Sequence, residues 1–80
     1  MEKNNPNNLK VGDGIWVDDA WEDDAGYFHG EQAIINKIEE NGELRLNWRL
    51  STRDKESHDL ILNYLDNEDK YYAENFRKMK

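Results

Sequence analysis

The sequence predicts one all-β domain, a small five-stranded barrel that carries a long acidic first loop and a short 3-10 or helical turn near the C-terminus. Three observations lead to this fold. Short apolar runs alternate with polar residues along most of the chain. Asn41-Gly42 lies between two such runs, which is the strongest short signal for a β-hairpin. Glycines interrupt the first run, and glycine inside a strand pattern indicates a bulge or bend.

The length of the chain limits its architecture. Eighty residues form one domain, which we assign to residues 9–80. Residues 1–8 are polar and without periodicity, so we expect a disordered tail there. A chain this short buries roughly 60% of its unfolded surface, so the core is thin. The chain has no cysteine, and therefore no disulfide stabilises the fold and no thiolate binds a metal.

The first third of the domain is predicted to be a bent strand followed by a loop. Apolar residues alternate on both sides of the glycines in residues 9–17, which we expect to form the first strand. Residues 18–30 form the long acidic loop in this prediction. Gly26 and Gly30 supply positions in that loop at which a positive φ costs nothing.

The hairpin over residues 33–50 has two alternative registers. A two-residue turn would pair the apolar residues of its second strand with two charged residues. A three-residue turn, with Gly42 in the left-handed position, pairs Leu44 with Ile38 and Trp48 with Ile34, and removes both charges from that face. We therefore predict the three-residue turn.

The last third of the chain is predicted to contain the remaining strands. Residues 51–58 are polar and are expected to form a connection. Residues 59–65 have apolar side chains on both faces and are expected to form a buried fourth strand. A turn follows at residues 66–70. Residues 71–80 fit either a short helix or a 3-10 turn followed by a last strand.

Three segments of the chain resemble the small barrels of the SH3-like superfamily, which includes SH3, Tudor and KOW-type modules. They are LKVGDGIWV at the start, the hairpin from IIN to LNW in the middle and YYAENFRKM at the end, and they span most of residues 9–79. The resemblance implies a barrel in which residues 18–30 are the long first loop, a loop that is often acidic in SH3 domains and reads basic ligand residues. It does not imply polyproline recognition, because the ALYDY-like start and the adjacent tryptophan pair are missing.

The acidic aromatic loop is the candidate binding site, because carboxylates and aromatic ring faces both attract cations. The candidate binding residues are Asp18, Asp19, Trp21, Glu22, Asp23, Asp24, Tyr27 and Phe28. One alternative is a solvated connection whose aromatic residues cap the core. Another is a calcium or magnesium site, which lacks the D-x-D-x-D-G spacing of a calcium loop, so we expect no metal or cofactor. Trp16 and Trp48 lie in predicted strands, where we expect them to pack in the core or at an edge.

Charge and motifs disfavour several classes of function. The net charge is −7, and residues 1–30 hold seven acidic and two basic side chains, so direct nucleic-acid binding is disfavoured. The histidines and hydroxyl residues show no triad or nucleophile-elbow pattern, so we expect no enzymatic activity. The chain lacks an apolar run long enough to cross a membrane and its start does not read as a signal peptide, so we expect a cytoplasmic location.

These features predict a non-enzymatic protein-interaction module, an accessory protein of a phage or mobile element, that binds a basic or polar surface of a protein partner through residues 18–30. One alternative is an acidic inhibitor that mimics nucleic-acid phosphates on a host enzyme. A second alternative is weak nucleic-acid contact through Arg45, Arg49 and Arg53, which share one alternating face. The sequence leaves the oligomeric state open.

Overall fold

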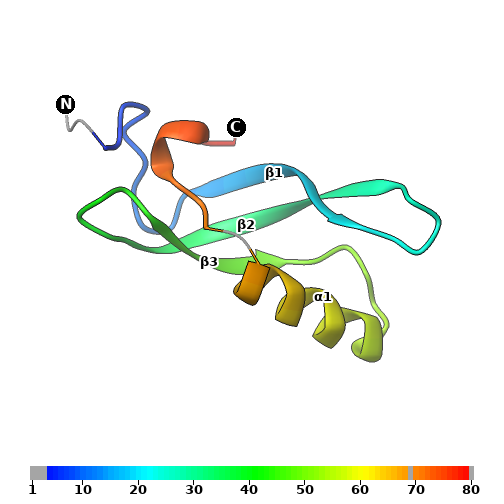
Figure 1. Cartoon of the computed structure of the whole chain (residues 1–80). Helices are drawn as coiled ribbons and strands as arrows, with labels where there is room; N and C mark the ends of the chain where they lie inside the picture. Colours follow the sequence, from blue (N-terminus) through cyan, green and yellow to red (C-terminus); the bar gives the residue numbers. More distant parts are fainter. Residues whose placement is uncertain (1–3, 69, 80) are drawn as a thin grey trace.

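A computed structural model of the chain describes residues 4–68 and 70–79 (Figure 1). Three strands, β1 (Gly14–Glu22), β2 (Phe28–Ile38) and β3 (Leu44–Arg49), form an open antiparallel sheet in the order β1-β2-β3. A helix, α1 (Lys55–Glu68), packs against the sheet, and a 3-10 turn, η1 (Ala73–Asn75), follows it. The prediction of a five-stranded all-β barrel is wrong, because three strands cannot close into a barrel and a helix completes the fold.

The main error concerns residues 59–65, which lie within α1 and do not form a strand. Ile61 and Leu65 are buried four residues apart, whereas Leu60 and Tyr64 are exposed. A spacing of four places the two buried residues on one helical face, toward the core. The apolar residues that the strand prediction placed on two faces therefore belong to a helix. One of its faces is buried, and Leu60 and Tyr64 form a second apolar stripe that is exposed to solvent.

Asp54 starts α1 as its N-cap residue. Its Oδ2 accepts hydrogen bonds from the backbone N–H of Ser57 at 3.0 Å and from the Ser57 hydroxyl at 2.7 Å. The N–H of His58 donates to the Asp54 carbonyl at 2.8 Å and forms the first helical bond. These bonds satisfy helix donors that otherwise lack partners, so the predicted polar connection over residues 51–58 ends at Asp54 and the helix begins at Lys55.

The β1–β2 hairpin occupies most of the predicted acidic loop. β1 begins at Gly14 and continues to Glu22, so residues 18–22 and 28–30 are strand and the turn is confined to residues 23–27. The register shifts between Val17 and Trp21, where Asp19 has a φ of 52°. This bulge lets a strand continue through a pair of aspartates, which have low strand propensity.

The turn of the β2–β3 hairpin confirms the predicted three-residue turn. Gly42 has a φ of 89°, its N–H donates to the Glu39 carbonyl at 2.9 Å, and Leu44 lies opposite Ile38 as predicted. The predicted pairing of Trp48 is wrong, because Trp48 lies opposite Ala33. The cause is a register shift between Ile35 and Lys37, which adds one residue to β2.

The terminal segments lie against the β2–β3 turn and β1. The Ala73 N–H donates to the Gly42 carbonyl at 2.8 Å, and the Met79 N–H donates to the Gly14 carbonyl at 2.8 Å. The Asn7 side chain donates to the Phe76 carbonyl at 2.7 Å. η1 matches the 3-10 turn of one alternative predicted for the C-terminal segment, but the last strand that was to follow it does not form over residues 76–79. Of the tail predicted to be disordered, residues 1–8, the first three residues lie outside the described residues.

The core lies on one face of the sheet. Buried and more exposed residues alternate along β1 and β2, so the buried side chains of both strands share a face. α1 and the segment after it add residues to the same cluster, and these elements therefore cover that face. The core residues are Leu9, Ile15, Val17, Ala20, Ala33, Ile35, Leu44, Trp48, Ile61, Leu65 and Ala73.

Candidate functional site

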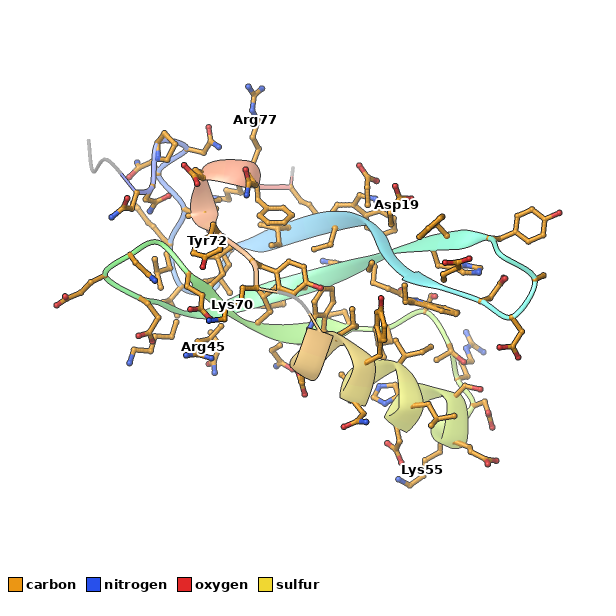
Figure 2. The ribbon with its side chains drawn as sticks, in the orientation of Figure 1. Asp19, Arg45, Lys55, Lys70, Tyr72 and Arg77 are labelled. Atoms are coloured by element: carbon orange, nitrogen blue, oxygen red, sulfur yellow. The ribbon has the colours of Figure 1, made fainter. Side chains whose placement is uncertain are left out.

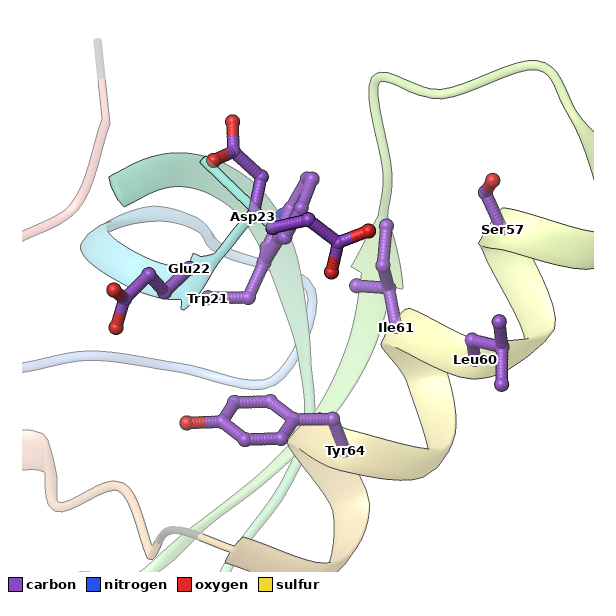
Figure 3. Close-up of a pocket in the computed structure, with 8 residues that line it drawn as sticks. Trp21, Glu22, Asp23, Ser57, Leu60, Ile61 and Tyr64 are labelled. Carbon is purple, nitrogen blue, oxygen red and sulfur yellow. The ribbon is translucent and has the colours of Figure 1, made fainter. Parts of the chain in front are cut away.

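The candidate site is an open groove of about 500 Å³ between α1 and the far end of the β1–β2 hairpin (Figure 3). We call residues 18–30 of this hairpin the arm, because β3 pairs with β2 only from Gln32 to Ile38 and leaves the arm beyond the sheet's third strand. This volume lies within the range of small-molecule sites, roughly 300–1,000 Å³. Its lining residues are Trp21, Glu22, Asp23 and Asp24 from the arm and Ser57, Leu60, Ile61 and Tyr64 from α1.

The arm side of the groove is built around Trp21. The Trp21 indole stacks on the His29 ring, with centroids 4.2 Å apart and an interplanar angle of 16°. His29 Nε2 lies 2.7 Å from Asp23 Oδ2. The other Asp23 oxygen, Oδ1, accepts the backbone N–H groups of Ala25 and Tyr27 at 2.9 and 3.0 Å. Asp23 therefore shapes the turn and also orients the ring on which Trp21 lies.

Glu31, a buried residue of β2, holds the Trp21 indole from the core side of the sheet. It is 1% exposed and is the charged residue in the core of the described chain. Its Oε2 accepts the Trp21 indole N–H at 2.8 Å, and its Oε1 accepts the Ser51 backbone N–H at 3.0 Å. Buried carboxylates are tolerated where hydrogen bonds replace water. Glu31 thus joins the arm to the connection that leads into α1, and so it links the two sides of the groove.

The helix side is apolar and exposed. Leu60 is 68% exposed and Tyr64 is 45% exposed, and they lie one turn apart. Figure 3 shows Tyr64 directed from α1 toward the arm. Ile61, which lies between them in sequence, is buried and forms the floor next to the core.

The charge of the molecule is concentrated on the β1–β2 hairpin. Residues 11–36 contain seven acidic residues and no lysine or arginine, whereas the rest of the chain contains eleven of each. The formal net charge of −7 therefore equals the charge of residues 11–36, which comprise most of this hairpin and the segment just before β1. The pKa of Asp23 is lowered, first by the hydrogen bond with His29 and then by the backbone N–H of Tyr27. Asp23 consequently stays ionised down to a more acidic pH than an ordinary aspartate.

The groove brings together four of the eight predicted binding residues, namely Trp21, Glu22, Asp23 and Asp24. The other four lie outside it. Asp19 points away from α1 (Figure 2), and Asp18 accepts the indole N–H of Trp16 at 2.7 Å. Tyr27 and Phe28 are 71% and 59% exposed at the end of the arm. Leu60 and Tyr64 were not predicted as site residues, and their spacing of four residues beside Ile61 and Leu65 was the signal that could have identified them.

The arginines do not form a basic stripe of three equivalent residues. Arg45 Nε lies 3.8 Å from Glu39 Oε1, and its Nη1 lies 3.7 Å from Glu43 Oε2 (Figure 2). Arg49 is exposed on β3, and Arg53 lies in the connection before α1. Acidic neighbours thus partly neutralise the first of these cations.

Two kinds of feature are absent from residues 4–68 and 70–79. No group of three or more histidine, aspartate or glutamate side chains is arranged to hold a metal ion in that part of the chain. No helix in it is long and apolar enough to span a membrane. Comparison of the chain with protein-family models, with curated proteins and with solved structures found no match.

Proposed function

We propose that this chain is a non-enzymatic protein-interaction module and that the groove between the arm and α1 binds a basic, partly apolar segment of a protein partner. The observation that carries the proposal is the pairing of two unlike walls. One wall presents carboxylates and the Trp21 indole, and the other presents exposed Leu60 and Tyr64. Among the residues that the structure describes, none that lines the groove is a lysine or an arginine.

The two walls contribute differently to binding. An exposed ion pair contributes about 0–1 kcal/mol, whereas burial of an exposed leucine or aromatic side chain contributes about 1.5–3 kcal/mol. Most of the affinity therefore comes from Leu60, Tyr64 and Trp21. The carboxylates select a cationic partner and accelerate its approach.

The proposal is tested with two fluorescein-labelled amphipathic peptides that share their apolar residues. One peptide carries arginine and lysine at its polar positions, and the other carries glutamine there. We expect the basic peptide to bind and the glutamine peptide to bind at least about tenfold more weakly, because it lacks charge complementarity.

Matched variants separate binding in the groove from attraction to any acidic protein. Asp24→Asn should slow association about two- to fivefold, whereas Glu40→Gln removes the same charge at the opposite end of the sheet and should change the rate by less than about twofold. Tyr64→Ala should weaken binding about tenfold, mainly through the dissociation rate. Equal effects of the Asp24 and Glu40 variants, with no effect of Tyr64→Ala, would mean that only the net charge attracts the peptide.

A further inference from the structure

The face of the hairpin turned away from the core carries an exposed aromatic surface. Trp16 alternates with the buried residues Ile15 and Val17, so its side chain points to that face, where it is 47% exposed. Phe28 lies on the same face, because it alternates with the core-facing residues of β2, and it is 59% exposed. This surface is separate from the groove, which lies on the α1 side of the arm.

The Trp16 indole is held in place from two directions. A Cβ atom built on Gly30 would lie 2.7 Å from Trp16 Cε2 and 2.9 Å from Nε1, so the ring lies directly on the glycine backbone. The indole N–H donates to Asp18 Oδ1 at 2.7 Å. One ring face therefore contacts the strand and the other faces solvent in a fixed orientation. Gly30 does not have a positive φ, contrary to the sequence prediction, and its role is this close approach.

The charges around this ring are negative. Asp18 holds one carboxylate oxygen at the indole edge and has a second oxygen with lone pairs for another donor. Glu22 lies directly opposite Phe28 in the ladder at the end of β1, where it also lines the groove, and of the described residues it is the one that both surfaces adjoin. Arg49 lies on the same face of the sheet as Trp16. The two residues are on different strands, however, and Gln32 of β2 lies between them.

We propose that Trp16, Asp18 and Phe28 form a second binding site, which takes the guanidinium group of an arginine side chain from a protein or peptide. A planar guanidinium stacks on an indole face and can at the same time donate to a carboxylate at its edge. A lysine ammonium supplies the charge without the flat stacking surface and keeps its hydration more strongly. The seat on Gly30 and the Asp18 hydrogen bond fix the ring before binding, which lowers the entropic cost of the contact. This site does not depend on the function proposed for the groove.

The test uses the indole N–H signals of the three tryptophans in ¹⁵N NMR spectra of the whole chain. Each signal is assigned by a single tryptophan-to-phenylalanine variant. Trp16 reports on the proposed site, Trp21 reports on the groove, and the buried Trp48 reports on the core. The probes are acetyl-Gly-Arg-Gly-amide, its lysine analogue and its citrulline analogue, which keeps the planar shape of arginine without the charge.

We expect the arginine peptide to shift the Trp16 signal saturably while the Trp48 signal stays fixed. The lysine peptide should bind about two- to fivefold more weakly, and the citrulline peptide should give no saturable shift. Asp18→Asn keeps an acceptor for the indole N–H but removes the charge, and should weaken arginine binding by a similar factor. Gly30→Ala should displace the indole and abolish the Trp16 response. A saturable shift of Trp21 alone, or equal responses to the arginine and citrulline peptides, would overturn the proposal.

Discussion

Truncation of the buried carboxylate in Glu31→Ala should destabilise the protein more than any substitution of an exposed acid. The substitution removes the acceptor of the Trp21 indole N–H and of the Ser51 backbone N–H, which now bond to Glu31 at 2.8 and 3.0 Å. A buried donor left without an acceptor costs about 1–3 kcal/mol. Trp21 is half-buried and Ser51 is exposed, so water can reach part of each donor and the lower half of that range applies.

The two donors together then cost about 2–4 kcal/mol, and the lost methylene adds about 0.8 kcal/mol. Relief of the desolvation of a buried charge offsets part of this sum. The expected net loss is about 2–3 kcal/mol, which corresponds to a fall in Tm of roughly 10–20 °C for a domain of this size. Glu31→Gln keeps one acceptor and the side-chain volume, so we expect about half of that loss.

Urea denaturation and thermal melting, followed by circular dichroism, measure these changes. Glu74→Ala is the matched control, because Glu74 is exposed on η1 and its truncation should change the stability by less than about 0.5 kcal/mol. If Glu31→Ala also fell within about 0.5 kcal/mol of the parent, the inference that Glu31 joins the arm to the connection before α1 would be refuted.

Three more predictions test the turn, the helix and the effect of acid. Gly42→Ala should lower the free energy of unfolding, measured by urea denaturation, by about 1–3 kcal/mol. The φ of 89° is strained for a residue with a side chain, and the new Cβ would lie 2.5 Å from the Asn4 carbonyl oxygen. An unchanged urea midpoint would contradict this prediction. Leu65→Ala should lower the free energy of unfolding by about 2–5 kcal/mol, whereas Leu60→Ala, at an exposed position, should lower it by less than about 0.5 kcal/mol. Similar losses in the two variants would mean that the buried face of α1 is misassigned. The pKa values of Asp23 and Asp54 are lowered in the folded state, by the hydrogen bond with His29 and by the Ser57 hydroxyl respectively, so the unfolded state binds protons first and stability should fall as the pH drops below about 4. Melting curves of the double variant Asp23→Asn/Asp54→Asn should depend less on pH in that range, and an identical dependence would exclude both carboxylates as its source.

The hairpins were the part of the fold that local sequence signals could predict. Asn41-Gly42 determines its turn through backbone sterics, which act over a few residues. The pairing of Trp48 could not be predicted in the same way, because the bulge between Ile35 and Lys37 places Ile35 and Ala33 on the core face and depends on contacts with α1 and η1. The register close to the turn was therefore correct and the register farther away was not.

The helix was missed because a short run of apolar residues fits the two-residue period of a strand as well as the 3.6-residue period of a helix. Residues 59–65 satisfy a buried strand and a helix equally well by pattern alone. The deciding signal lay before the run, where Asp54 precedes Ser57 by three residues in an N-cap arrangement. This error also hid half of the groove, since Leu60 and Tyr64 reach the arm only from a helix. The acidic side of the groove could be predicted, because its residues are adjacent in sequence.

The position of β1 at the edge of the sheet gives its carboxylates a protective role. An edge strand offers unpaired backbone groups to another edge. Among the described residues outside the sheet, the Met79 N–H bonds to β1 at the Gly14 carbonyl, and the rest of this edge is left open. Two copies that joined through this edge would place two hairpins, each with six acidic residues, side by side. Mutual repulsion opposes such strand addition at neutral pH and weakens as the solution approaches the isoelectric point near pH 4.7. The charges that attract a basic partner therefore also keep copies of the protein apart, and aggregation through β1 should begin in mild acid before the fold itself is lost.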